Sequence, residues 1–171
     1  MASPSRGTMI GLMSGTSLDG IDAVALEIED NPIEGCTGAA LALPKRVLAH
    51  YSLAMPPALK SRLIQLCSPL AAGETTAIDQ IELLGDARCE LTDLYALAVA
   101  RLPERITRSA LAIGAHGQTI RHRPERAFSL QLIDGARLAE KTALPVVTDF
   151  RAADIAAGGH GAPLAPVFHQ A

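Results

Sequence analysis

The stretch GLMSGTSLDGID, residues 11–22, decides which fold the sequence predicts. It starts inside an apolar run, residues 8–13, and passes through small and hydroxyl-bearing residues into a second run, residues 21–28. A third run follows at residues 45–53, and turn-forming residues separate the three. Short apolar runs bounded by Gly, Pro and Asn predict β-strands. Because the connections are short, we expect the three strands to form an antiparallel meander.

Leucine residues at helical spacing dominate the middle of the chain. One set predicts a helix that begins at Pro56, and a longer set predicts a helix that ends at Pro103. Thr76, with Asp79 three residues later, is typical of a capping box before the longer helix. Gly85 is the weakest point of that helix, at a cost of about 1 kcal/mol relative to Ala.

The last third of the chain alternates between strand and helix patterns. Strands are expected at residues 111–114, 128–132 and 144–148, with a helix at 136–141 and a helical turn at 151–157. Three strands, then helices, then strands and helices in alternation predict an α/β fold with a mixed sheet and helices on both faces.

A final helix is expected to begin near Ala162, with Pro163 in its first turn. The pattern reaches Ala171 without a Gly or Asn cap, and Val167 and Phe168 are apolar. We therefore expect the sequence to stop inside a helix, as a truncated chain would.

Composition argues against several classes of function. Apolar residues make up 49% of the 171 residues, enough for a packed core. A net charge of −3, with two Tyr, three Phe and no Trp, argues against a nucleic-acid-binding protein. The apolar runs are too short to span a membrane, and residues 1–7 lack the apolar segment of a secretory signal.

Cysteine usage indicates the compartment. The sequence has three cysteines, which is an odd number, and no two of them have C-x-x-C spacing: Cys36, Cys67 and Cys89. We expect free thiols in a reducing environment, and therefore a cytoplasmic protein.

The small residues of the 11–22 stretch suit a phosphate-binding loop. Gly15 and Gly20 carry no side chain that would keep backbone N–H groups from phosphate oxygens. Thr16 and Ser17 add hydroxyl donors, and Asp19 is a candidate Mg²⁺ ligand. The loop is not a Walker motif, because no Gly-Lys-Ser/Thr follows. From composition alone an ordinary hairpin turn remains the favoured alternative.

A second polar block, GAHGQTIRH at residues 114–122, follows an apolar strand. It presents His116, Gln118 and Thr119 between glycine residues, which suits recognition of a polyhydroxylated sugar. A polar turn whose histidine is satisfied by hydrogen bonds is an equally supported alternative.

Both blocks resemble signatures of anhydro-N-acetylmuramic acid kinases. Residues 11–22 resemble G-[LV]-M-S-G-T-S-L-D-G-[VIM]-D, and residues 114–122 resemble G-x-H-G-Q-T-[IV]-x-H. Residues 146–164, VVTDFRAADIAAGGHGAPL, resemble V-x-D-F-R-x-x-D-[IV]-A-x-G-G-Q-G-A-P-L. Met13 stands where many actin-like kinases carry Asp, as is usual in this family, whereas His160 replaces the usual Gln.

The resemblance implies an actin-like (ribonuclease H-like) fold, ATP and Mg²⁺ as cofactors, and a sugar substrate. It implies that ATP is bound by Gly15, Thr16, Ser17, Leu18, Asp19, Gly20, Ile21 and Asp22, with the metal at Asp19. It implies that the sugar is bound by His116, Gln118, Thr119 and Arg151, and by Gln131, because QLID at residues 131–134 resembles the family's Q-I-G-[ND]. Arg151 would recognise the lactyl carboxylate through a bidentate pair. The alternative is an Arg151–Asp154 ion pair on a surface turn.

The implied reaction converts 1,6-anhydro-N-acetylmuramic acid, ATP and water to N-acetylmuramic acid 6-phosphate in cell-wall recycling. The family's catalytic aspartate lies in a later G-F-D-C-G-P-G-N block, and no such block occurs in these 171 residues. We therefore expect residues 1–171 to be the N-terminal lobe of a kinase, inactive when alone and able to form a homodimer. The alternatives are a remnant that binds nucleotide or sugar weakly without catalysis and, less favoured by the charge, a ribonuclease-H-like nuclease.

Overall fold

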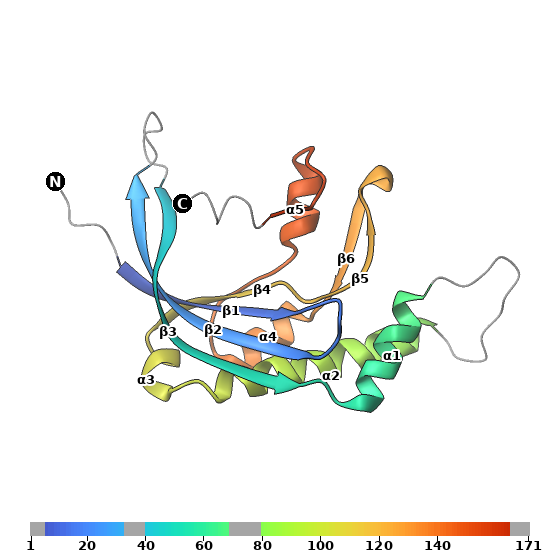
Figure 1. The fold of residues 1–171 in the computed structure, drawn as a ribbon, viewed down its shortest axis with the longest axis horizontal. Helices are drawn as coiled ribbons and strands as arrows, with labels where there is room; N and C mark the ends of the chain where they lie inside the picture. The colour runs from blue at the N-terminus through green and yellow to red at the C-terminus, as the bar shows by residue number, and fades with distance from the viewer. Residues whose placement is uncertain (1–5, 33–39, 69–79, 165–171) are drawn as a thin grey trace, which may run out of the picture.

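The meander expected from the sequence forms one side of a mixed five-stranded sheet. The structure is a computed structural model that describes residues 6–32, 40–68 and 80–164 (Figure 1). Strands β1 (Arg6–Ser14), β2 (Gly20–Pro32) and β3 (Ala40–Ala54) pair antiparallel in sequence order. This confirms the predicted meander, with strands longer than the apolar runs that predicted them.

Two parallel strands complete the sheet. Strand β4 (Ala110–Ala115) lies parallel to β1, and β7 (Val146–Val147) lies parallel to β4, so the order is β3-β2-β1-β4-β7. The strand predicted at residues 144–148 is thus only two residues long. Pro145 has no N–H to donate, which keeps the ladder from extending through it.

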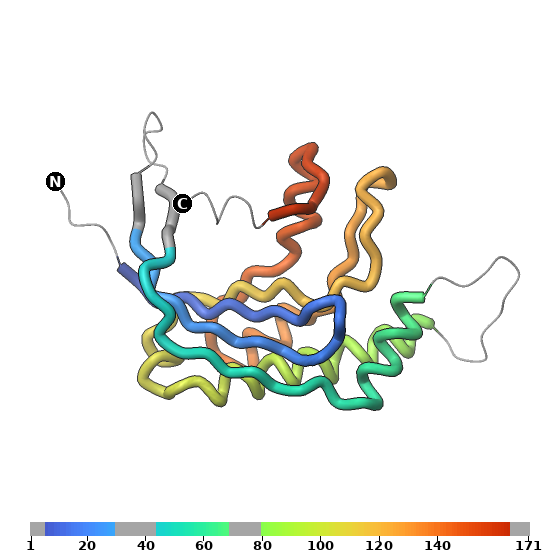
Figure 2. Tube along the Cα trace, in the orientation of Figure 1, coloured from blue at the N-terminus to red at the C-terminus, as the bar shows by residue number. Residues whose placement is uncertain are grey.

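One face of the sheet is covered by helices. Helix α2 (Gln80–Ala100) crosses beneath the strands, with α1 (Pro57–Cys67) and α4 (Gly135–Thr142) on either side (Figures 1 and 2). Short helix α3 (Glu104–Thr107) follows α2. Because strand side chains alternate between faces, every second residue of β1 and β2 meets these helices. The buried apolar side chains of this core include Ile10, Leu12, Ile21, Ala23, Ala25, Leu59, Leu63, Leu91, Tyr95, Ile113, Leu132 and Leu138.

A hairpin and a short helix rise on the other side of the sheet. Strands β5 (Gln118–Arg123) and β6 (Phe128–Leu132) form a separate two-stranded sheet, joined by the 3₁₀ turn η1 (Pro124–Arg126). Helix α5 (Phe150–Ala156) stands beside it (Figure 1). Figure 2 shows α5 and the hairpin on the side opposite α2, as helices on both faces require.

The helix predicted from Ala162 is wrong where the structure describes it. Residues 162–164 are not helical. The chain before them is held in a loop, because Gly161 has φ +69° and contacts both Arg151 and Asp154. The remainder of that predicted helix, the Thr76–Asp79 capping box and Cys36 lie outside the described residues. Cys67 and Cys89 are free thiols.

Among the described residues, no helix is both long enough and apolar enough to cross a membrane.

Candidate nucleotide and sugar site

The two polar blocks meet at one edge of the sheet. Strands β1 and β4 are parallel neighbours, so the residues after their carboxyl ends, Gly15 and His116, leave the sheet at the same edge. The backbone N–H of His116 donates to the carbonyl of Leu12 over 3.0 Å, which fixes this adjacency. In open α/β sheets, ligands bind at the carboxyl ends of such strands.

The loop after β1 is anchored at its centre. The N–H of Leu18 donates to the Gly15 carbonyl over 3.1 Å, and Leu18 takes the left-handed conformation with φ +56°. Its side chain is only 4% exposed. Burying a leucine stabilises by about 1.5–3 kcal/mol, enough to offset the strain of a positive φ. Thr16, Ser17 and Asp19 are therefore left exposed to solvent while the loop remains attached to the core.

The two glycines of this loop have different roles. A Cβ atom on Gly20 would lie 2.6 Å from the carbonyl oxygen of Leu53, so β2 and β3 pair closely only if residue 20 is glycine. On Gly15 the nearest atom to a Cβ would be Ser17 Oγ at 3.6 Å, an ordinary contact. The fold therefore needs glycine at 20 and tolerates a side chain at 15, which leaves an open approach to the backbone at Gly15.

The two carboxylates of the loop have separate partners. Lys60 Nζ of α1 lies 3.1 Å from Asp19 Oδ1. This hydrogen bond, with one from Ser17, holds the pKa of Asp19 below its usual range. Asp22 accepts from Ser52 Oγ at 2.5 Å and lies 3.1 Å from His50 Nε2. The bond from Ser52 is the main reason that the pKa of Asp22 is also lowered.

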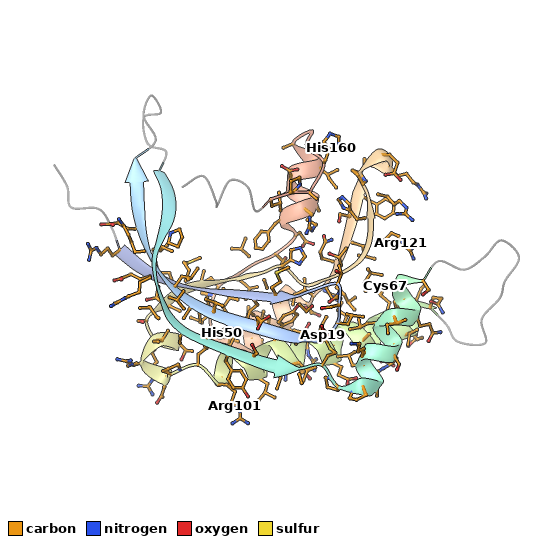
Figure 3. All side chains as sticks on the ribbon, viewed as in Figure 1. Asp19, His50, Cys67, Arg101, Arg121 and His160 are labelled. Carbon is orange, nitrogen blue, oxygen red and sulfur yellow. The ribbon has the colours of Figure 1, made fainter. Side chains whose placement is uncertain are left out.

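These carboxylates do not form a metal cage. Asp19 lies at the end of the β1–β2 connection, away from His50 on β3 (Figure 3). In the part of the chain that the structure describes, no group of three or more His, Cys, Asp or Glu could hold a metal ion. Mg²⁺ at Asp19 would therefore need ligands from bound phosphates and water, which is how Mg²⁺ is usually held at nucleotide sites.

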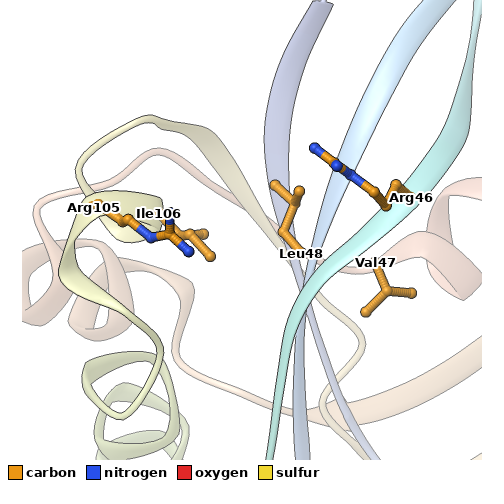
Figure 4. Close-up of a pocket in the computed structure, with 5 residues that line it drawn as sticks. All are labelled: Arg46, Val47, Leu48, Arg105 and Ile106. Atoms are coloured by element: carbon orange, nitrogen blue, oxygen red, sulfur yellow. The ribbon is translucent and has the colours of Figure 1, made fainter.

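A hollow of about 570 Å³ lies on the sheet face away from α2. Its lining includes Gly11, Gly114, Asp22, His50 and His116, so the hollow adjoins both polar blocks. A second hollow, of about 440 Å³, lies between β3 and α3 and is lined by Arg46, Val47, Leu48, Arg105 and Ile106 (Figure 4). The second hollow contains none of the residues that the sequence places in a site.

Two contacts orient the ring of His116. Its Nδ1 lies 2.7 Å from the Gly117 carbonyl, so Nδ1 carries the hydrogen and donates. Its Nε2 then accepts from Arg151 Nε at 2.9 Å. Burial, and secondarily the positive charge of Arg151, lower the pKa of His116. The ring therefore remains unprotonated at neutral pH.

Arg151 also holds the loop that follows α5. Its Nη1 donates to the Gly161 carbonyl at 2.6 Å, and Asp154 Oδ2 accepts from the Gly161 N–H at 2.7 Å. A Cβ on Gly159 would overlap the Asp154 carboxylate, so a side chain there would displace Asp154 from its bond with Gly161. Arg151 and Asp154 thus both bind this loop, in place of the Arg151–Asp154 surface pair considered from the sequence.

The remaining sugar-site candidates lie on the β5–β6 hairpin. Gln131 Nε2 donates to Ser129 Oγ at 2.7 Å and to Thr119 Oγ1 at 3.3 Å. Gln131 is 6% exposed, and its Oε1 has no hydrogen-bond partner among the described residues. Gln118 points elsewhere: it is 1% exposed and its Oε1 accepts from Ser14 Oγ at 2.6 Å. The structure therefore places Thr119 and Gln131 together and directs the Gln118 side chain into the core.

Comparison with known proteins identifies the family. The model of the anhydro-N-acetylmuramic acid kinase family matches residues 7–171. The chain belongs to the anhydro-N-acetylmuramic acid kinase family. An anhydro-N-acetylmuramic acid kinase from Psychrobacter cryohalolentis is 43% identical over 175 residues, which cover 96% of this chain and 39% of the relative. One from Bordetella petrii is 42% identical over 174 residues, covering 100% of this chain and 41% of the relative.

A third relative, from Albidiferax ferrireducens, is 46% identical over 168 residues that cover 94% of this chain and 38% of the relative. The chain thus spans about two fifths of the length of these curated relatives. Membership of the anhydro-N-acetylmuramic acid kinase family makes the mixed α/β sheet with flanking helices an actin-like kinase fold.

Several side chains at the candidate site were not among those predicted from the sequence. Lys60 lies on α1, which was predicted from its leucines alone. Its positive charge is the signal that could have suggested it as a partner for Asp19. His50 and Ser52 are two positions apart on β3, so they lie on the same face of the sheet, and both contact Asp22. Ser14 and Tyr95 face the core, and no local pattern distinguishes them from ordinary buried residues.

Proposed function

We propose that this chain supplies the first phosphate loop and part of the sugar site of an ATP-dependent anhydro-N-acetylmuramic acid kinase. The observation that carries the proposal is the meeting of the Gly15–Asp19 loop with the His116–Thr119 block at the carboxyl ends of β1 and β4. In the proposed reaction, water opens the 1,6-anhydro ring and the freed O6 takes the γ-phosphoryl group of ATP. The products are N-acetylmuramic acid 6-phosphate and ADP.

The phosphates would approach the backbone at Gly15, where the fold leaves the space of a side chain free. Thr16 and Ser17 would donate from their exposed hydroxyls. Asp19 is deprotonated at neutral pH and would hold Mg²⁺ together with phosphate oxygens, while Lys60 beside it adds a positive charge. Leu18 and Ile21 have buried side chains, so they would contribute through the backbone only.

The sugar would bind beside the β5–β6 hairpin. A buried acceptor without a partner costs free energy, and a ligand hydroxyl or amide N–H would satisfy Gln131 Oε1. The 1,6-anhydro sugar offers both donors. Because Nε of Arg151 donates to His116 and Nη1 gives one hydrogen to Gly161, the hydrogens of Nη2 and the second hydrogen of Nη1 remain for a lactyl carboxylate. A bidentate pair would therefore have to use Nη1 and Nη2, since Nε is occupied.

We place this function in the cytoplasm, where ATP is available and where Cys67 and Cys89 would remain reduced. The family's catalytic aspartate belongs to a block that these residues do not contain. The alternative function is weak binding of nucleotide or sugar without catalysis.

The experiment is a titration of the 171-residue chain with a non-hydrolysable ATP analogue and Mg²⁺, in which binding is monitored by the NMR chemical shifts of backbone amides. We expect shifts at residues 15–19 that Gly15→Val abolishes, because a side chain would occupy the phosphate approach. Gly85→Val is the matched control, since a Cβ on Gly85 meets nothing within 4 Å. Shifts that persist in Gly15→Val, or that vanish equally in Gly85→Val, would contradict the assignment.

A further inference from the structure

Three buried polar side chains form a directional hydrogen-bond chain through the core. The Tyr95 hydroxyl donates to Ser14 Oγ at 3.0 Å, and Ser14 Oγ donates to Gln118 Oε1 at 2.6 Å. The three residues are 0%, 1% and 1% exposed, respectively. The amide orientation of Gln118 is supported by its Nε2, which lies 3.4 Å from the Thr119 carbonyl.

Two members of this hydrogen-bond chain, Ser14 and Gln118, lie in the two candidate ligand-binding blocks. Ser14 is the last residue of β1 and directly precedes Gly15. Gln118 is the first residue of β5 and lies between Gly117 and Thr119. Tyr95 lies in α2, outside both blocks, and reaches Ser14 across 81 positions of sequence. A side chain of α2 is thereby bonded to the start of the phosphate loop, and through it to the sugar block.

Apolar side chains of similar volume would fill this space without the desolvation of three polar groups. A fully partnered buried network, in contrast, requires defined donor and acceptor directions and so permits one arrangement of the backbones that carry it. Ser14 has a single hydrogen to donate and gives it to Gln118, so its position depends on both neighbours. Displacement of either loop would break the bond between Ser14 and Gln118, and the core offers no other partner to replace it.

We infer that Tyr95 is a positioning residue that fixes the spacing between the Gly15–Asp19 loop and the His116–Thr119 block, with Ser14 and Gln118 as its links. The two loops then open together and respond together to a ligand on either one. Gln118 serves this network and not direct sugar contact. The identity of the ligands rests on the proposed function, whereas the coupling of the loops does not.

The test is amide hydrogen exchange in the 171-residue chain without ligand. The amides of Leu18 and His116 report on the two loops, and the amide of Ile113, bonded to the Pro145 carbonyl, reports on the sheet. Tyr95→Phe should speed exchange at Leu18 and His116 by about threefold to tenfold, the effect of one lost buried hydrogen bond. Exchange at Ile113 should remain unchanged.

Thr92→Val is the matched control. Thr92 is also fully buried on α2. Its hydroxyl donates to the Arg88 carbonyl and accepts from the Asp134 N–H, so it takes no part in the Tyr95–Ser14–Gln118 network. The control should leave Leu18 and His116 unaffected. The inference is overturned if Tyr95→Phe speeds neither amide, only one of them, or Ile113 by the same factor. If Tyr95→Phe does not fold, the same comparison in Ser14→Ala decides, since it removes both bonds of the network.

A second arm adds the ATP analogue with Mg²⁺. In the unmodified chain, nucleotide should slow exchange at both Leu18 and His116, whereas in Ser14→Ala, which also loses the bond to Gln118, it should slow Leu18 alone. Equal protection at both sites in the variant would contradict the positioning role. If nucleotide protects neither amide in the unmodified chain, the proposed nucleotide site fails, while the ligand-free comparison still decides the role of Tyr95.

Discussion

The guanidinium of Arg151 donates from Nε to His116 Nε2 over 2.9 Å, across 35 positions of sequence. A cation that donates to an imidazole keeps that nitrogen unprotonated. Arg151 thereby adds to burial in lowering the pKa of His116, while it also holds the Gly161 loop. Both residues were expected from the sequence to face a sugar, and the structure shows that they first bind each other.

We predict that folding lowers the pKa of His116 below its ordinary value of 6.5. The unfolded chain then binds a proton that the folded chain releases, so this group reduces stability as the pH falls below 6.5. In a histidine titration by NMR, Arg151→Gln should raise the His116 midpoint, because the repelling charge is gone. Arg121→Gln removes the same charge from the hairpin without touching His116 and should leave the midpoint in place. Equal midpoints in all three proteins would contradict the pairing.

We predict that Gly20→Ala destabilises the chain by about 1–3 kcal/mol, the usual cost of overpacking. The added Cβ would lie 2.6 Å from the Leu53 carbonyl, which is backbone and has little room to move. Urea denaturation gives the change directly. Gly15→Ala serves as the control and should stay within about 0.5 kcal/mol of the original chain, as surface substitutions usually do. Similar losses for both would mean that Gly15 is also structural.

We predict that Gln131→Leu weakens binding of 1,6-anhydro-N-acetylmuramic acid by about tenfold, the effect of one lost hydrogen bond to a buried acceptor. Binding of the ATP analogue by the same variant is the internal control and should be unchanged. Calorimetric titration of both ligands makes the comparison. A variant that loses nucleotide affinity to the same extent would indicate general damage to the fold.

We predict that Asp93 makes stability depend on acidity. Hydrogen bonds from Arg137, reinforced by Lys141, lower the pKa of Asp93 from 3.8 to about 2. Because the folded pKa is depressed, the stabilisation is fully present above pH 3.8 and is lost as the pH falls through about 2. Asp93→Asn should therefore flatten the pH dependence of the urea midpoint between these values. A curve as steep as the original would assign the effect to other carboxylates.

We predict that the 171-residue chain, tested alone, forms no N-acetylmuramic acid 6-phosphate. A missing general base costs about 10²–10⁴-fold in rate. Loss of positioning of one substrate against the other removes a further contribution of roughly 7–11 kcal/mol. Mass spectrometry after incubation with ATP, Mg²⁺ and the sugar makes the measurement. Product above a no-protein control would point to a base within these residues, and Asp19, Asp149 and Asp154 would be the first to replace.

Periodicity in the sequence was enough to predict the scaffold. The meander and helix α1 were predicted because Leu59, Leu63 and Leu66 recur at helical spacing and the three apolar runs have turn residues between them. Strand β5 was not predicted, because its polar residues are typical of a loop. In the structure every second side chain at its start, Gln118 and Ile120, is buried. The direction of Gln118 depends on Ser14, and a bond over 104 positions leaves no local signal.

The site residues divide in the same way. The Gly15–Asp19 loop and the His116 block were located by motif, and their meeting follows from the parallel pairing of β1 with β4. The different roles of Gly15 and Gly20 could not be predicted, because they depend on how near β3 approaches. The partners of Arg151 lie in part in a loop that folds back on α5, and no sequence pattern indicates that Arg151 Nη1 reaches the Gly161 carbonyl.

The 104 positions between Ser14 and Gln118 also have a consequence for the order of folding. The meander closes short loops, whereas the Ser14–Gln118 contact must enclose α1, α2 and β4 before it forms, and such closures slow folding. We expect the phosphate loop to reach its final geometry only in the last stages of folding, after α2 has packed against the sheet and Tyr95 has bonded to Ser14. Ligand binding by this chain would then report completed folding, since an intermediate that has only the meander carries the loop without the partner that fixes it.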